Sequence, residues 1–351
     1  MRRALELAQR GFGRTGRNPC VGAVVVRDER IVGTGYHHVF GGPHAEILAL
    51  RSAGRLARGS DLYVTLDPCC HFGKTPPCTD AILKAGVARV ISAHGDPRDR
   101  AKKSCERLII GGVAFASGLL RGPARRVLQP YLKYVETGLP YVILKVATTL
   151  DGKVATASGV SRGITSEVSR KRVHFLRSRV DAVLTGGGTV SMDTPHMGVR
   201  KIAGRDPLRV LLDADLKVDL DTPFFRDDRV LVFTTPAASR AQVSALRARG
   251  IEVIILPSLE NLSEILRLLA DRDIALVMIE AGPRLMTSFI AGGCVDQYLQ
   301  FIAPKLLGGE GSPTGFEGQD VTDLQAVKIL QHPEISSVGG DFLIDGFLRW
   351  Y

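Results

Sequence analysis

The spacing of one histidine and two cysteines constrains the first part of this chain more than any other feature. The sequence holds His44-Ala45-Glu46 and, later, a Pro-Cys pair followed by eight residues and a second cysteine, which places the two cysteines at Cys69 and Cys78. One imidazole and two thiolates are a suitable ligand set for a tetrahedral zinc ion whose fourth position stays open. If His44, Cys69 and Cys78 bind one ion, two distant segments must meet in the fold.

The glutamate of this motif predicts the chemistry. Glu46 lies two residues from His44, close to the open position and not needed as a ligand. Zinc makes a water molecule nucleophilic, and a free carboxylate beside it can move protons. This combination is typical of enzymes that hydrolyse a C–N bond on a nucleobase-like ring. We therefore predict one zinc ion and a catalytic proton-transfer role for Glu46.

Each part of the motif also has a simpler interpretation. A lone His-x-Glu is usually the first turn of a helix, and two cysteines near prolines are a weak signal by themselves. The order, spacing and flanking prolines together favour a metal site. Cys70 is an alternative ligand, but its side chain should point elsewhere when Cys69 binds, and we expect Cys20, Cys105 and Cys294 to be buried apolar residues.

The length of 351 residues predicts two domains. Helix and strand patterns alternate over residues 1–120, which predicts a mixed sheet covered by helices. Proline and glycine pairs over residues 121–140 predict a linker. Residues 141–351 again alternate and predict a second α/β domain, with strand patterns at 141–147, 182–185, 209–213, 230–234, 251–255, 275–280 and 296–302.

The net charge of +10 is unevenly distributed, because residues 1–130 carry +11 and the remainder −1. The basic residues of the first part are dispersed, and few aromatic residues accompany them. This favours a small phosphorylated ligand over nucleic acid. No apolar run approaches the roughly 18 residues of a membrane span, and the N-terminus has no apolar signal core. With only six cysteines, we expect a reducing, cytoplasmic location and no membrane partner.

The sequence resembles a known family, the bifunctional riboflavin-biosynthesis enzymes in which a pyrimidine deaminase is fused to a pyrimidine reductase. The resemblance extends over nearly the whole chain. In the first half it is carried by Asn18-Pro19, Gly35-Tyr36-His37, Pro43 through Glu46, Tyr63 through Leu66 and His71 through Cys78. In the second half it is carried by Leu150-Asp151-Gly152, Ile164-Thr165-Ser166, Gly188-Thr189-Val190, Glu280 through Pro283 and Ala303 through Gly308.

The resemblance implies a cytidine-deaminase-like first domain. Its reaction would be hydrolytic deamination of 2,5-diamino-6-ribosylamino-4(3H)-pyrimidinone 5′-phosphate. The positions that match the family's substrate contacts are Asn18, His37, Lys74 and Asp96. Lys74 suits a phosphate, and Asn18 can bind a base edge.

For the second domain the resemblance implies a dihydrofolate-reductase-like fold that uses NADPH to reduce the ribosyl group to a ribityl chain. No Gly-x-Gly-x-x-Gly follows the first strand, but two strand–glycine–helix junctions offer backbone amides for phosphates. The family's cofactor contacts fall at Ala147, Gly163, Thr189, Asp193, Gly282, Pro283, Arg284, Leu285, Met286, Thr287 and Ser288. Its substrate contacts fall at Ser161, Arg177, Met197, Arg200 and Glu280, with Arg177 and Arg200 as expected phosphate clamps.

Several positions depart from the family pattern. Asp67 replaces a glutamate, Cys70 a serine and Arg98 an asparagine, and Gly163 stands where a tryptophan usually packs on the cofactor. The segment 194–198 also differs. One alternative is therefore an active deaminase with a weakened or inactive reductase, and another is a nucleic-acid-binding or editing deaminase. Self-association into a homo-oligomer is compatible with either.

Overall fold

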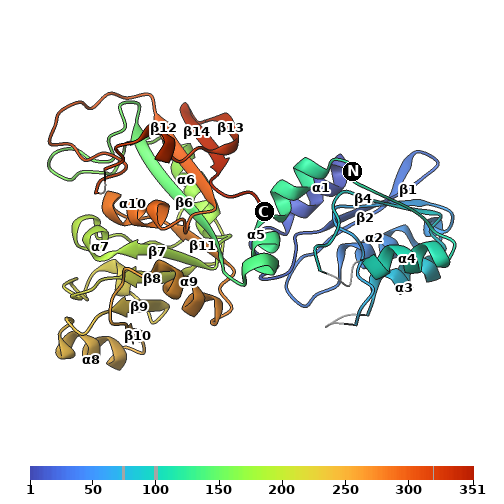
Figure 1. Cartoon of the computed structure of the whole chain (residues 1–351), viewed down its shortest axis with the longest axis horizontal. Helices are drawn as coiled ribbons and strands as arrows, with labels where there is room; N and C mark the ends of the chain where they lie inside the picture. Colours follow the sequence, from blue (N-terminus) through green and yellow to red (C-terminus); the bar gives the residue numbers. More distant parts are fainter. Residues whose placement is uncertain (73–75, 99–101, 319) are drawn as a thin grey trace. The chain divides into compact units, whose positions relative to one another are not determined.

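The computed structural model of the chain describes residues 1–72, 76–98, 102–318 and 320–351. It divides into two compact units (Figure 1). Unit 1 comprises Met1–Leu139 together with Tyr351, and unit 2 comprises Pro140–Trp350. Among the helices described, none combines the length and apolar character needed to cross a membrane.

Unit 1 is built on a five-stranded sheet in the order β2-β1-β3-β4-β5. β1 pairs antiparallel with β2 and β3, whereas β3–β4 and β4–β5 are parallel, which confirms the predicted mixed sheet. The strands are β1 (Gly22–Arg27), β2 (Arg30–Tyr36), β3 (Asp61–Val64), β4 (Arg89–Ser92) and β5 (Ala114–Ser117). The helices are α1 (Arg2–Arg10), α2 (Ala45–Ala53), η1 (Gly54–Ala57), α3 (Cys78–Ala85), α4 (Lys102–Ile110) and α5 (Arg121–Thr137).

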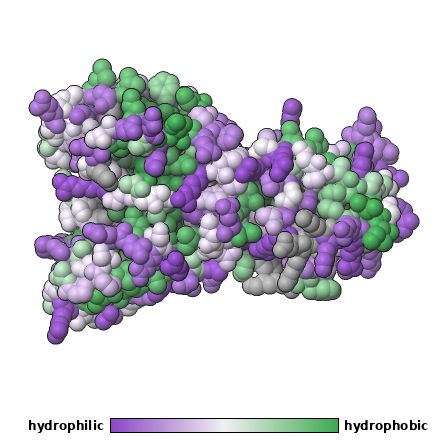
Figure 2. All heavy atoms as spheres, in the orientation of Figure 1, coloured by the Kyte–Doolittle hydropathy of each residue, from purple (hydrophilic) through white to green (hydrophobic). Residues whose placement is uncertain are grey.

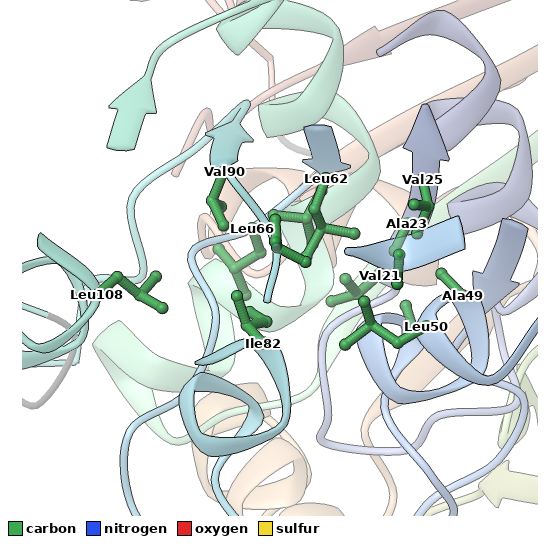
Figure 3. Packing of buried hydrophobic residues seen from close by; sticks show 14 of the residues in the cluster. Val21, Ala23, Val25, Ala49, Leu50, Leu62, Leu66, Ile82, Val90 and Leu108 are labelled. Atoms are coloured by element: carbon green, nitrogen blue, oxygen red, sulfur yellow. The ribbon is translucent and has the colours of Figure 1, made fainter. Parts of the chain in front are cut away.

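Helices cover both faces of this sheet because successive strand residues point to opposite sides. Val24 of β1 packs with Ala4 and Leu7 of α1. Its neighbours Ala23 and Val25 belong to the larger core cluster, which also contains residues of α2, as Figure 3 shows. The sheet thereby fixes α2, the helix that carries Glu46.

The segment predicted as a linker is different in the structure. Residues Arg121–Thr137 form helix α5 with Pro130 inside it, and this helix is part of unit 1. Prolines normally disfavour a helix interior, but α5 buries an apolar face that includes Ala124, Leu128 and Leu132. That burial outweighs the local penalty, because most helix stability in proteins comes from packing.

The last residue of the chain also belongs to unit 1, contrary to the predicted domain end. The backbone N–H of Tyr351 donates to Gln129 Oε1 at 3.0 Å, and Gln129 Nε2 donates to the Tyr351 carbonyl at 3.0 Å. Both bonds attach Tyr351 to α5.

Unit 2 contains a nine-stranded sheet in the order β10-β9-β8-β7-β11-β6-β12-β14-β13. The strands from β10 to β12 are parallel, and β14 and β13 add antiparallel pairs at one edge. The strands are β6 (Tyr141–Thr149), β7 (Ala182–Gly186), β8 (Leu208–Leu212), β9 (Val230–Thr234), β10 (Glu252–Ile255), β11 (Leu276–Ile279), β12 (Gln297–Ala303), β13 (Gln331–Val338) and β14 (Asp341–Phe347). The helices are α6 (Glu167–Arg177), α7 (Gly187–Asp193), η2 (Pro223–Phe225), α8 (Arg240–Ala248), α9 (Leu262–Ala270), α10 (Pro283–Ala291) and η3 (Leu324–Ala326).

The hairpin β13–β14 was not predicted. Most residues of β13 are exposed. A strand without a buried face needs no alternation of apolar and polar residues, and its sequence therefore gives no strand signal. Ile335 is 73% exposed and Phe342 46% exposed. Figure 2 shows both hydrophilic and hydrophobic residues on the visible surface of unit 2.

Candidate active sites

The three predicted metal ligands of unit 1 lie together. His44 caps the N-terminus of α2, Cys69 lies in the loop after β3, and Cys78 is the first residue of α3. Their ligand atoms all lie within 4.8 Å of one another. His44 Nδ1 is 3.5 Å from Cys69 Sγ and 3.2 Å from Cys78 Sγ. Tetrahedral zinc with bonds of about 2.0–2.3 Å would separate such N and S atoms by about 3.5 Å, so the donor set fits zinc.

Cys69 is the cysteine of this cluster that most readily becomes a thiolate. A hydrogen bond from Cys78 and the neighbouring His44 lower the pKa of Cys69 to about 4. The backbone N–H of Cys78, at the start of α3, also donates to Cys69 Sγ at 3.4 Å. The same hydrogen bond, together with burial, raises the pKa of the Cys78 thiol. A cation in this cluster would take the place of the shared proton.

Glu46 is the buried carboxyl group beside the cysteines. Its side chain is in the first turn of α2, only 3% of the residue is exposed, and burial raises its pKa. A raised pKa makes a carboxylate a stronger proton acceptor, which suits a group that takes a proton from water.

A cavity of about 220 Å³ opens beside this cluster. His44, Glu46 and Cys69 lie in its wall, as do three of the four residues expected to bind substrate, Asn18, His37 and Asp96. The fourth, Lys74, lies outside the described residues. The lining also includes residues that the sequence did not single out as contacts, namely Phe40, His71, Arg98 and Tyr131.

Asn18 and His37 form an oriented pair. The His37 ring lies with Nδ1 3.1 Å from the Pro43 carbonyl and Nε2 3.3 Å from Asn18 Nδ2. Burial lowers the pKa of His37, so the ring is neutral near pH 7. A neutral ring that donates from Nδ1 to Pro43 accepts at Nε2 from Asn18. The amide oxygen of Asn18 is then left to accept a hydrogen bond from a ligand.

In unit 2, the two strand–glycine–helix junctions lie side by side. β7 and β11 are adjacent parallel strands, and each leads into a helix, α7 or α10. A Cβ placed on Gly282 would lie 3.6 Å from Thr189 Oγ1. The backbone amides at the N-termini of both helices therefore face one region, which suits the phosphates of a dinucleotide.

The expected cofactor contacts gather at this edge of the sheet. Thr189 and Asp193 belong to α7, and the first six residues of α10 are Pro283 through Ser288. Ala147 lies near the end of β6, the strand next to β11. Gly163 has a φ of +92°, a conformation that favours glycine, and its carbonyl accepts a hydrogen bond from Lys305 Nζ at 2.7 Å. A Cβ on Gly163 would meet nothing within 4 Å.

A buried ion cluster lies next to these junctions. Glu280 accepts hydrogen bonds from Arg177 Nε at 2.6 Å, from Arg177 Nη2 at 3.0 Å and from Lys145 Nζ at 3.2 Å. Burial alone would raise the pKa of Glu280, but the charges of Arg177 and Lys145 hold it at about 2. Arg177 also donates to the Gly198 carbonyl at 3.2 Å and lies near Met197 Sδ at 3.8 Å. Because Glu280 and Gly198 take most of its donors, the geometry does not support Arg177 as a free phosphate clamp.

Two further residues that the resemblance places at the substrate are Ser161 and Arg200. Ser161 Oγ donates to Asp193 Oδ1 at 2.9 Å. Arg200 is an exposed residue. Partial burial of its guanidinium and the nearby charges of Arg177, Arg162 and Arg226 lower its pKa. This concentration of positive charge favours an anionic ligand at Arg200.

Comparison with known proteins gives matches for both units. Residues 140–338 match the family model of the RibD C-terminal domain, and residues 1–94 match that of the cytidine and deoxycytidylate deaminase zinc-binding region. The riboflavin biosynthesis protein RibD of Aquifex aeolicus is 40% identical over 346 residues, which cover 98% of this chain and 96% of the relative. The RibD of Escherichia coli is 38% identical over 331 residues and covers 88% of each chain.

Solved structures of similar length also match. Acinetobacter baumannii RibD has a TM-score of 0.84 and 35% identity, over 99% of this chain and 97% of that one. A diaminohydroxyphosphoribosylaminopyrimidine deaminase/5-amino-6-(5-phosphoribosylamino)uracil reductase from Thermotoga maritima has a TM-score of 0.85 and 36% identity, over 98% of this chain and 96% of that one.

Proposed function

This chain belongs to the RibD family of bifunctional deaminases and reductases of riboflavin biosynthesis, and from that premise we propose how its own residues divide the two reactions. Unit 1 deaminates the diaminopyrimidine ribosylamino 5′-phosphate, and unit 2 reduces the ribosyl group of the product with NADPH. The observation that carries the first assignment is the convergence of three metal-ligand atoms and a buried glutamate on one cavity.

In unit 1, His44, Cys69 and Cys78 would hold one zinc ion. When bound, zinc supplies the Lewis acidity that makes water a nucleophile near neutral pH. Glu46 would accept one proton of the attacking water and deliver it to the ring nitrogen, and would then transfer the second proton of that water to the leaving amine, so that C–NH2 and water become C=O and ammonia. The buried position of Glu46 supports this role, because burial raises the pKa of the carboxyl group and so favours its protonated form once it has taken a proton.

The other cavity residues would orient the substrate. Asn18, oriented by His37, presents an acceptor to an amino group of the pyrimidine edge. Asp96 suits the hydroxyl groups of the ribose, and Lys74 is proposed for the phosphate on the basis of the resemblance. These groups would position the substrate so that the reacting carbon lies close to its nucleophile.

In unit 2, the N-termini of α7 and α10 would bind the phosphates of NADPH, whose nicotinamide supplies a hydride when bound. Thr189 and the residues Gly282 through Ser288 fit this role because they lie in the first turns of the two helices, whereas Asp193, at the end of α7, is proposed as a cofactor contact on the basis of the resemblance. Arg200 would bind the substrate phosphate, Ser161 and Met197 would line the substrate, and the Glu280 cluster would fix the floor of the site.

An assay that follows ammonia and NADPH separately tests this division of labour. Purified protein with zinc should release ammonia from the diaminopyrimidine substrate, and the product should then oxidise NADPH. Ammonia release without NADPH oxidation at saturating cofactor would contradict the reductase assignment and favour a weakened second unit. The two thiolates of the zinc site also lead us to propose a reducing, cytoplasmic environment.

A further inference from the structure

Tyr131 connects helix α5 with the cavity of unit 1. Its hydroxyl donates a hydrogen bond of 2.6 Å to Asp96 Oδ1. Its ring lies against the guanidinium of Arg98, with Cζ 5.2 Å from the ring centroid. Tyr131, Asp96 and Arg98 all line the cavity that contains His44 and Glu46.

These contacts hold one oxygen of the Asp96 carboxylate in place. Oδ1 accepts from Tyr131 and from the backbone N–H of Arg98 at 3.1 Å. Burial and the neighbouring Asp96 raise the pKa of Tyr131, so its hydroxyl stays protonated and acts as the donor. Two donors on one oxygen leave the second oxygen of Asp96 to accept hydrogen bonds from a ligand.

The ring of Tyr131 holds the Arg98 guanidinium in place, as its hydroxyl holds Asp96. Within the part of the chain that the structure describes, no carboxylate pairs with the Arg98 guanidinium. A guanidinium on an aromatic face keeps its donors at its edge free for an anion. One end of the cavity therefore presents a carboxylate and a cation, which are complementary to a ribose that carries a phosphate.

We propose that Tyr131 is a positioning residue of the deaminase site, whose hydroxyl orients Asp96 and whose ring supports Arg98 toward the phosphoribosyl arm of the substrate. The inference rests on the proposed function of unit 1 and deepens it. It also gives α5 a role in the deaminase unit that its sequence, rich in turn residues, did not suggest.

A simpler role for Tyr131 is packing alone, since the residue is 3% exposed and belongs to the core cluster. Tyr131→Phe separates the two roles because it keeps the ring and removes the hydroxyl. A control on the same helix is Tyr134→Phe, since Tyr134 accepts from Arg17 Nη1 at 3.1 Å and is not part of the cavity wall.

The test measures kcat and KM for ammonia release with the 5′-phosphorylated substrate and with the same nucleoside lacking its phosphate. Tyr131→Phe should raise KM about tenfold for both compounds, the usual effect of losing a hydrogen bond to a charged group. Its kcat and its melting temperature should change little, and Tyr134→Phe should match the wild type. On an Asp96→Asn background, Tyr131→Phe should change KM by no more than about twofold, because the two residues act as one unit.

Two further variants test the contact between the Tyr131 ring and Arg98. Tyr131→Leu and Arg98→Gln should both reduce the preference for the phosphorylated compound, whereas Tyr131→Phe should keep it. An unchanged KM in Tyr131→Phe, or a loss of stability and kcat at constant KM, would overturn the proposal even if Tyr131→Leu does not fold. Wild-type protein that releases no ammonia would instead contradict the proposed function itself, so the two failures are distinct.

Discussion

At the scale of single residues, His44 and Glu46 show how two neighbouring side chains acquire different roles. His44 is the residue that caps α2 and reaches both cysteines, whereas Glu46 lies two residues further on, in the first turn of α2, and is buried. Glu46→Gln keeps the size of the side chain and removes its capacity to move a proton. We expect ammonia release to fall by about 10²–10⁴-fold, the usual contribution of a general acid–base group.

Zinc content, measured by elemental analysis, should stay at one ion per chain in Glu46→Gln, because Glu46 is not among the three ligands. Loss of the metal in this variant would show that Glu46 is a ligand, and full activity would show that another group moves the proton.

Cys69 and Cys70 offer a matched pair of substitutions. Of these two cysteines, Cys69 is the one whose sulfur belongs to the ligand cluster, with His44 Nδ1 and Cys78 Sγ. We expect the Cys69→Ser variant to bind little zinc and to release little ammonia, because a serine hydroxyl is a poorer zinc ligand than a cysteine thiolate. Cys70→Ser should retain both. The reverse result, measured by the same metal analysis and ammonia assay, would assign the ligand to Cys70.

At the scale of elements, α2 can approach β2 closely because glycine faces it. A Cβ on Gly35 would lie 2.4 Å from the Ala45 carbonyl oxygen and 2.6 Å from the Ala49 nitrogen, both in the backbone of α2. Gly35→Ala must therefore push α2 away, and overpacking of this kind costs about 1–3 kcal/mol. We expect a lower melting temperature by circular dichroism and weaker zinc retention, because α2 carries the proposed metal ligand His44 at its N-terminus.

Gly122 provides the control for this variant. It lies in α5, and a Cβ at this position would meet nothing within 4 Å. Gly122→Ala should stabilise the protein by about 0.5–1 kcal/mol, because alanine favours a helix more than glycine does. Equal effects of the two substitutions would show that α2 does not depend on the close approach at Gly35.

Three elements of unit 2 meet at one carboxylate, which gives that unit a defined pH dependence. Arg177 ends α6, Lys145 lies in β6, and Glu280 follows β11. The pKa of Glu280 is depressed from 4.5 to about 2. A depressed carboxyl pKa contributes stability that is present above pH 4.5 and lost as the pH falls toward 2, here about 3 kcal/mol.

Trp350 is the only tryptophan of the chain and belongs to unit 2, so its fluorescence reports on the unfolding of that unit. The melting temperature followed at Trp350 should fall between pH 4.5 and pH 2. Glu280→Gln should be less stable at neutral pH, because Arg177 and Lys145 lose their partner. Its stability should vary less with pH in this window, and an identical pH dependence in both proteins would exclude Glu280 as the source.

The sequence allowed the local features of both sites to be predicted better than the contacts between elements. The mixed sheet of unit 1 and the α/β class of unit 2 follow from alternating patterns, and the order of His44, Cys69 and Cys78 already indicated one metal. The partnership of Arg177 with Glu280 depends on tertiary packing, which no local pattern encodes. Tyr131 was missed because the prolines and glycines around it predicted a linker, whereas the buried face of α5 decides that the segment is helical.

At the scale of the whole molecule, two units with separate cores imply two reactions that can be removed one at a time. Unit 1 holds the proposed metal ligands, and the residues proposed for NADPH and for the reductase substrate all lie in unit 2. Removal of zinc with a chelator should stop ammonia release, and added deaminated product should still oxidise NADPH at the normal rate. Conversely, Arg200→Gln should slow NADPH oxidation by at least about tenfold through weaker phosphate binding, with ammonia release unchanged.

Both rates must be measured on the same full-length preparations, with zinc restored to the chelated sample as a control. If chelation also stopped NADPH oxidation from added product, and restored zinc recovered it, the units would depend on each other, contrary to the independence that their separate cores predict.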